Sequence, residues 1–269
     1  DNGSQREGNI INVKNGVLKV EDSLIGNNIT QVPGTIGLTN STATFSNTDF
    51  ISNKAAFGGA INAKDSDVTI TDCKFEENTV NRRGGAISME GGTLTIDDNS
   101  TFDKNGFAGG TNESLGGALF LTDMSSVTIG KAQFNNNGLI DEEYGFRTMD
   151  GGAIYLNNIP NATFNGTQFK ENRVWGYNLG SGGAVYANGA STVVNVNGAK
   201  FHDNYASIYG GGMSLKYGTA IFKDLDGDPT EFIGNQVEYA YDFAGGGLFI
   251  NMGYAKMWDA AIYDNFAQH

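Results

Sequence analysis

The segment GGALFLTDMSSVTIGKAQFNNN, residues 116–137, contains one complete unit of the pattern that decides the fold. It begins with a Gly-Gly-Ala step and ends with a Phe-x-x-Asn motif, and short runs of alternating apolar and polar residues lie between them. The two motifs alternate seven times along the chain. Seven ordered alternations are not expected by chance, even in a chain rich in Gly and Asn, and a repeat of this length is typical of solenoid proteins.

The spacing of the motifs gives the length of the repeat. Successive Phe positions lie 25 to 35 residues apart, which corresponds to one coil of a stacked solenoid. The Phe-x-x-Asn motifs are Phe50/Asn53, Phe75/Asn78, Phe102/Asn105, Phe134/Asn137, Phe169/Asn172, Phe201/Asn204 and Phe232/Asn235, with degenerate copies at Leu24/Asn27 and Ile262/Asn265. The glycine steps are Gly58–Ala60, Gly84–Ala86, Gly116–Ala118, Gly151–Ala153, Gly182–Ala184, Gly210–Gly212 and Gly245–Gly247.

The residues between the motifs predict strands. Runs such as Ile87–Met89 and Val127–Ile129 alternate in polarity, and the runs are rich in β-branched and aromatic residues. Two or three short strands per coil, each stacked in parallel on the next coil, make a parallel β-helix. We therefore expect an all-β solenoid of about nine coils, with residues 1–269 forming a single domain that is a segment of a longer surface protein.

Each position that recurs in the repeat has a predicted role in such a coil. The Phe residues stack as an aromatic ladder in a narrow core. The Asn residues stand at turns, where their amides bond the coils above and below and where a left-handed backbone is tolerated. The paired glycines form a corner that a Cβ atom would obstruct.

Composition limits the function classes. The formal net charge of −13 disfavours nucleic acid and anionic lipid as partners. No segment approaches the roughly 18 apolar residues of a membrane-spanning helix. The single cysteine, Cys73, excludes an internal disulfide framework and is expected to be a buried structural thiol.

The alternation of Phe-x-x-Asn with Gly-Gly-Ala followed by Ile, Leu or Val resembles the repeats of chlamydial polymorphic membrane proteins, whose passenger domains are of the autotransporter type. The resemblance covers the chain from about Leu24 to its end. It implies a right-handed β-helix that is exported and displayed on a cell surface, where it acts as an adhesin. The chain departs from that pattern in its last two glycine steps, which have Gly in place of Ala, and in its scarcity of cysteines.

Length variation within the repeat indicates where a partner would bind. Between each Asn and the next glycine step the chain holds 4 to 13 residues, whereas the rest of the coil is nearly constant in length. In a solenoid such insertions line up along one ridge. This ridge is rich in Tyr, Trp and Arg, the residue types that dominate binding energy. The predicted ligand-binding residues are Tyr144, Phe146, Trp175, Tyr177, Tyr239 and Tyr241. The alternative is that these aromatic side chains pack within their own loops.

Three functions fit this ridge. We expect an extracellular or cell-surface adhesin or display module that binds a protein or glycan of a host or neighbouring cell, without catalytic activity. A structural subunit of an extracellular filament or stalk, with end-to-end self-association, is the alternative. A polysaccharide-active enzyme is less favoured, because the acidic residues are scattered over loops and do not recur on strands.

His202 follows the Phe of its motif and has no recognisable partner in the sequence, so we expect it to be a solvated turn residue.

One motif suggests a metal. The segment Lys223–Pro229 is an insertion in the otherwise constant part of the coil, and Asp224, Asp226 and Asp228 alternate in it like the first ligands of a calcium loop. The later glutamate of such a loop is absent, because Asn235 occupies its position. No cofactor is expected other than Ca²⁺ at these three aspartates, and an acidic turn without metal is the alternative.

Overall fold

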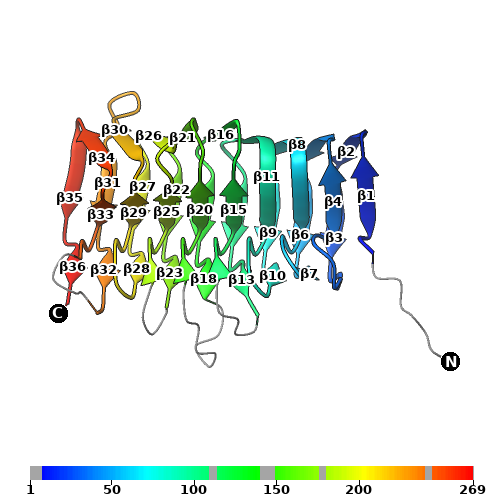
Figure 1. The fold of residues 1–269 in the computed structure, drawn as a ribbon, viewed down its shortest axis with the longest axis horizontal. Coiled ribbons are helices and arrows are strands. Elements are labelled where there is room, and N and C mark those ends of the chain that lie inside the picture. The colour runs from blue at the N-terminus through cyan, green and yellow to red at the C-terminus, as the bar shows by residue number, and fades with distance from the viewer. Residues whose placement is uncertain (1–7, 109–113, 140–148, 176–179, 240–243, 269) are drawn as a thin grey trace.

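The computed structural model describes residues 8–108, 114–139, 149–175, 180–239 and 244–268. These residues form 36 strands and no helix. The coils stack along one long axis to make a rod, with the first and the last described strands at opposite ends of that axis (Figure 1). No helix that could span a membrane occurs in the described part of the chain.

The largest sheet, sheet A, has two columns of parallel strands. The first column contains β1 (Ile11–Lys14), β4 (Ile36–Thr39), the first half of β8 (Ile61–Thr71), the first half of β11 (Ile87–Ile96), β15 (Leu119–Thr122), β20 (Ile154–Asn157), β25 (Val185–Asn188), β29 (Met213–Lys216) and β33 (Leu248–Asn251). The second column contains β2 (Val17–Glu21), β5 (Thr42–Ser46), the second halves of β8 and β11, β16 (Ser126–Ile129), β21 (Ala162–Asn165), β26 (Val193–Asn197), β30 (Thr219–Lys223) and β34 (Tyr254–Met257).

Three further parallel sheets complete the coils. Sheet B contains β3 (Leu24–Gly26), β6 (Asp49–Ile51), β9 (Lys74–Glu76), β12 (Thr101–Asp103), β17 (Gln133–Asn135), β22 (Gln168–Lys170), β27 (Lys200–His202), β31 (Thr230–Ile233) and β35 (Ala260–Tyr263). Sheet C contains β7 (Lys54–Ala55), β10 (Thr79–Val80), β13 (Gly106–Phe107), β18 (Gly138–Leu139), β23 (Arg173–Val174), β28 (Tyr205–Ala206), β32 (Gln236–Val237) and β36 (Phe266–Ala267). Sheet D contains β14 (Ser114–Leu115), β19 (Met149–Asp150) and β24 (Gly180–Ser181).

The nine strands of sheet B correspond to nine coils, which confirms the parallel β-helix and its expected number of turns. A typical coil contains two strands in sheet A, one in sheet B and one in sheet C. This is more than the two or three strands expected from the sequence. The additional strand is the short one of sheet C, which follows each Asn.

The predicted aromatic ladder fills the core behind sheet B. The rings of Phe50 through Phe232 stack from coil to coil with centroid separations of 4.5 to 5.3 Å, and all seven are fully buried. Ile262 pairs with Phe232 and continues the ladder into the last coil, as predicted. In the first coil the partner of Phe50 is Ile25, so the degenerate motif predicted at Leu24/Asn27 was placed one residue too early.

The predicted asparagine ladder is also present. Asn137 is fully buried and its Oδ1 accepts hydrogen bonds from the backbone N–H and the Nδ2 of Asn105. Its own Nδ2 donates to the Oδ1 of Asn172 at 3.0 Å and to the carbonyl oxygen of Phe102 at 2.9 Å. In the first coil the ladder residue is Asn28 and not Asn27. The left-handed backbone falls on the residue before each Asn, for example Asn136 with φ of 54°, and not on the ladder Asn itself.

The glycine corners have the predicted cause. The first glycine of six steps is left-handed, with φ between 54° at Gly58 and 71° at Gly151. The second glycine faces the next coil so closely that a Cβ at Gly117 would lie 1.9 Å from the carbonyl oxygen of Gly152. The alanine that follows is fully buried in the five steps that have one.

Cys73 is buried, as expected, and burial raises the pKa of its thiol.

Sheet C makes a second, smaller core where the sequence predicted only loops. Its inward side chains Val80, Phe107, Val174, Ala206 and Val237 pack together with Met149. Phe107, one of the aromatic residues of the predicted ridge, is only 1% exposed. It therefore follows the alternative of packing within the protein and does not belong to a binding surface.

Candidate functional site

The predicted aromatic ridge lies beside sheet C, and the structure describes part of it. Tyr144, Phe146, Tyr177 and Tyr241 lie outside the described residues. Trp175 and Tyr239 are described, and they contact each other although they come from coils two apart. The site can therefore be built from these two residues and their neighbours.

Tyr205 joins the two predicted residues into one cluster. The indole of Trp175 stacks on the Tyr205 ring at 6.0 Å with planes 8° apart, and meets the Tyr239 ring edge-on at 6.2 Å. Arg173, the register partner of Tyr205 on the neighbouring strand, places its guanidinium 5.4 Å from the centre of the Tyr205 ring. The hydroxyl of Tyr205 donates a hydrogen bond to Glu238. We call these five residues the aromatic cluster.

The aromatic cluster borders an open hollow of about 350 Å³. Arg173, Trp175, Tyr205 and Glu238 line it, together with residues of β32 and the last coil. Tyr239 is 53% exposed, and Trp175 and Tyr205 are half-buried. Rigid rings beside an arginine and a glutamate can bind a partner through apolar contact, cation–π interaction and hydrogen bonds together.

A second candidate surface lies on the outer face of sheet B. In each strand the Phe points inward, so the residues before and after it point outward. The outward side chains of β12, β17, β22, β27 and β31 line a groove of about 620 Å³, which we call the polar groove. Gln133, Gln168 and Lys200 form one row along it, and Asn135, Lys170 and His202 form the next.

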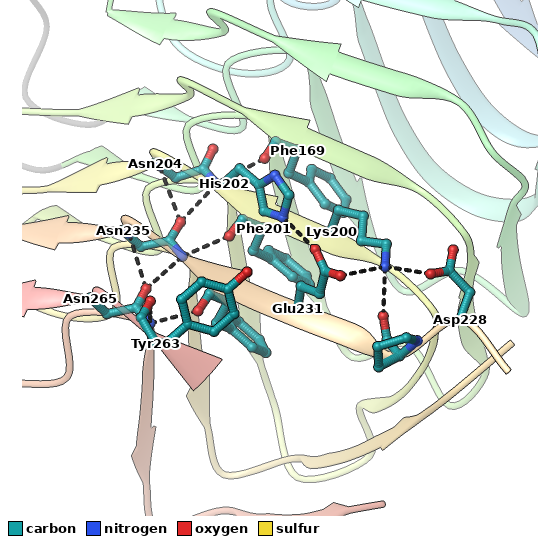
Figure 2. Close-up of polar contacts among 12 residues, drawn as sticks. Phe169, Lys200, Phe201, His202, Asn204, Asp228, Glu231, Asn235, Tyr263 and Asn265 are labelled. Carbon is teal, nitrogen blue, oxygen red and sulfur yellow. Dashed lines mark hydrogen bonds and ion pairs between the residues drawn. The ribbon is translucent and has the colours of Figure 1, made fainter. Parts of the chain in front are cut away.

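A charged network closes one end of the polar groove (Figure 2). Lys200 and His202 both converge on the Glu231 carboxylate, with Nζ to Oε1 at 2.9 Å and Nε2 to Oε2 at 2.8 Å. Lys200 also donates to Asp228 at 2.7 Å and to the carbonyl oxygen of Pro229 at 2.9 Å. His202 therefore has an ionisable partner, and its interpretation as a solvated turn residue without one was wrong.

The network shifts the ionisation of its members. Burial raises the pKa of Glu231, but the hydrogen bonds from Lys200 and His202 outweigh burial and hold this pKa below its ordinary value of 4.5. Burial lowers the pKa of Lys200, but the hydrogen bonds to Asp228 and Glu231 outweigh burial and hold this pKa above its ordinary value of 10.5. Both groups are therefore ionised across the neutral range.

The predicted calcium ligands are not brought together. Asp224 accepts a hydrogen bond from the backbone N–H of Gly227, and Asp228 pairs with Lys200. Asp226 lies between them with a left-handed backbone in a tight turn. In the described ranges no three His, Cys, Asp or Glu side chains are grouped to hold a metal ion. The geometry supports the acidic turn, and calcium binding stays a prediction.

The sequence pattern located the aromatic ridge but missed the polar groove. Tyr205, Arg173 and Glu238 fall within the predicted ridge, although only their contacts assign them to the cluster. The sequence does indicate one property of the groove residues. They flank each motif Phe, so on a strand they must face outward. Their type varies from coil to coil, so no repeat marks them.

The comparisons with known proteins agree with the architecture. No curated protein and no solved structure gave a significant match to the chain. A family model described as the right-handed β-helix region matches residues 9–237, which is most of the sequence. The match indicates that the coils are right-handed, and the chain belongs to the right-handed β-helix family.

Proposed function

We propose that this protein is a non-catalytic, extracellular binding module, similar to an adhesin, that recognises a protein or glycan on another cell. The observation that carries the proposal is the aromatic cluster, in which three rings from three successive coils meet beside an open hollow. The resemblance to polymorphic membrane proteins points the same way. A β-helix of the right-handed family is compatible with such a role.

The architecture explains why a binding role would use this position. Arg173, Tyr205 and Gln236 are register partners on β23, β28 and β32, so backbone pairing fixes the spacing of the cluster. The inward neighbours Val174, Ala206 and Val237 anchor the same strands in the second core. A partner would meet a surface that is already ordered, which reduces the entropy lost on binding.

The test is binding of the purified protein to cells and to glycan and protein arrays. Trp175→Ala and Tyr239→Ala are expected to lower the affinity by about 10-fold or more each, as aromatic hot spots do. Trp258→Ala is the matched control, because Trp258 is 41% exposed and its ring lies against the ammonium groups of Lys223 and Lys256, outside the aromatic cluster. Circular dichroism would check that all variants remain folded.

Two results would contradict the proposal. Equal loss of binding in the Trp258 variant would mean that the aromatic cluster is not the recognition surface. Absence of binding by the unaltered protein would favour the alternative of a structural filament or stalk subunit, which negative-stain microscopy of concentrated protein would examine directly.

A further inference from the structure

A row of stacked aromatic side chains runs along the outer face of sheet A and is interrupted by one small residue. Phe120, Tyr155 and Tyr186 are register partners on successive strands, and their rings stack with centroid separations of 5.3 and 5.4 Å. The next position of the row is Ser214, and the position after it is Phe249. A serine therefore stands where the row would need another ring.

A neighbouring row of residues also has a small side chain at this point. Asp150 and Ser181 of sheet D and the following Tyr209 are successive register partners. Side chains of this row reach the outer face of sheet A, because the ring of Tyr209 stacks on that of Phe249 at 4.4 Å. Ser181 is too short to do the same. Ser181 and Ser214 together border a hollow of about 170 Å³, which we call the serine gap.

The serine gap is lined by aromatic rings and by hydroxyl groups that have no partner. Tyr186 and Tyr209 both line it, and in the described chain their rings do not contact each other. Ser181 is 7% exposed and Ser214 is 2% exposed, and among the described residues neither hydroxyl has a hydrogen-bond partner. Because a buried hydroxyl without a partner costs free energy, a ligand that bonds to these serines would recover that cost.

The charges around the serine gap favour a ligand without net charge. Asp150 and Lys216 line it, and no other acidic or basic residue of the described chain does. The backbone N–H of Ser181 donates to Asp150 at 3.2 Å, whereas Lys216 forms no ion pair with any described residue. A ligand of either charge would be attracted by one of these groups and repelled by the other. A neutral hydroxyl can donate to the carboxylate or accept from the ammonium group.

The hydroxyl of Tyr186 adds a further donor. Burial, and then the nearby charge of Asp150, raise the pKa of Tyr186 above its ordinary value of 10.0, so the hydroxyl stays protonated at neutral pH. The lining therefore offers donors and acceptors beside two rings.

We propose that the serine gap binds a small phenol, a neutral single aromatic ring that carries a hydroxyl group. The ring would extend the interrupted row, because aromatic rings stack favourably with centroids about 4.5 to 7 Å apart. The hydroxyl would bond to Ser181 and Ser214. The size agrees, because an apolar cavity of about 150 Å³ can hold one benzene molecule. The gap lies where sheets A and D meet, whereas the aromatic cluster lies beside sheet C, so this site is separate from the proposed cell-binding surface.

The test is a titration at pH 7 followed by ¹⁹F NMR of four probes that share one fluorinated ring. The probes are 4-fluorophenol, fluorobenzene without the hydroxyl, 4-fluorobenzoate as the anion and 4-fluorobenzylamine as the cation. We expect 4-fluorophenol to bind at millimolar concentration or below, and about threefold or more tightly than each of the others.

Variants of the two serines test the assigned contacts. Ser181→Ala and Ser214→Ala should each weaken binding of 4-fluorophenol about three- to tenfold, the value of one hydrogen bond, and should leave the affinity for fluorobenzene unchanged. Ser214→Phe should abolish binding of all four probes, because its ring would occupy the gap. Circular dichroism would check that each variant is folded.

Ser88→Ala is the matched control, because Ser88 occupies the same outward row on β11 and is 8% exposed, but does not line the gap. It should leave every affinity unchanged. Trp175→Ala should do so as well, so failure of the cell-binding function would not affect this result. The inference is overturned if 4-fluorophenol does not bind, if a charged probe binds more tightly, or if both alanine variants bind 4-fluorophenol as the unaltered protein does.

Discussion

At the scale of single residues, the buried asparagines are the most demanding positions of the chain. Asn137→Ala would remove the acceptor for the backbone N–H of Asn105, and that donor would stay buried without a partner. It would also leave the carbonyl oxygen of Phe102 without the Asn137 amide. We expect a loss of about 2–4 kcal/mol in the free energy of unfolding, measured by urea denaturation.

An exposed asparagine provides the control for this prediction. Asn161 lies on the surface just before β21. Asn161→Ala is expected to change stability by less than about 0.5 kcal/mol. If Asn137→Ala cost no more than Asn161→Ala, the ladder would be a consequence of the fold and not a source of its stability.

The charged network at the end of the polar groove predicts a pH dependence. Because the folded pKa of Glu231 is lowered, its contribution to stability is complete above 4.5 and is lost as the pH falls through the lowered value. Because the folded pKa of Lys200 is raised, its contribution is complete below 10.5 and is lost as the pH rises through the raised value. The network therefore stabilises the protein across the whole neutral range.

Glu231→Gln should lower the melting temperature at neutral pH, with a cost of about 1 kcal/mol, and should flatten the acid limb of the stability profile. Glu90→Gln is the control, because the Lys64–Glu90 pair is 3.5 Å apart and both side chains are more than half exposed. Exposed pairs of this kind contribute little. An unchanged acid limb in Glu231→Gln would show that the network does not stabilise the folded state.

At the scale of elements, the corners between coils depend on glycine. A Cβ at Gly117 would lie 1.9 Å from the carbonyl oxygen of Gly152, and backbone atoms of Gly138 lie within 2.4 Å. None of these atoms is the end of a flexible side chain, so two coils would have to separate. We expect Gly117→Ala to cost about 3–5 kcal/mol or to prevent folding, as judged by circular dichroism and soluble yield.

Gly8→Ala is the control for the corner, because an added Cβ there meets no atom within 4 Å. It should leave the melting temperature unchanged. A folded Gly117→Ala protein of ordinary stability would mean that the stack can expand at this corner.

The sequence predicted the elements where side-chain type repeats. Phe134 and Asn137 occur with their counterparts in every central coil, and the aromatic and asparagine ladders follow from them. The first coil has no Phe, so nothing distinguished Ile25 from Leu24 and the register was displaced by one residue. Strands of two residues, such as β13 with the buried Phe107, are too short to show an alternation.

The candidate surfaces were harder to predict for a related reason. Trp175 and Tyr239 could be predicted as ligand-binding residues because loop length and composition both mark the ridge, and that role stays a prediction. Gln133, Gln168 and His202 occupy outward positions whose side chains are free to vary, and their grouping depends on the register between coils. Such a site becomes visible only when neighbouring strands are placed side by side.

At the scale of the whole molecule, the strands of each coil pair only with those of the coils before and after it, so stability should vary along the rod. The central Phe134 is fully buried, whereas at the same inward position Ile262 in the last coil is 51% exposed and Ile25 in the first is partly exposed. Local opening should therefore begin at the two ends of the described stack and reach the centre last. The polar groove includes the central strands β17 and β22, whereas the hollow beside the aromatic cluster reaches the last coil.

Amide hydrogen exchange would measure this gradient. We expect the free energy of opening to rise from about 0 kcal/mol in the end coils to the full unfolding free energy around β17 and β22. The buried Asn137 amide N–H, bonded to Asn172, should be among the slowest to exchange. Asn28, whose ladder bond lies in the first coil, provides the comparison within the same experiment. Equal protection of the two amides would mean that the rod opens only as one cooperative unit, and binding to either surface would then stabilise the end coils as much as the centre.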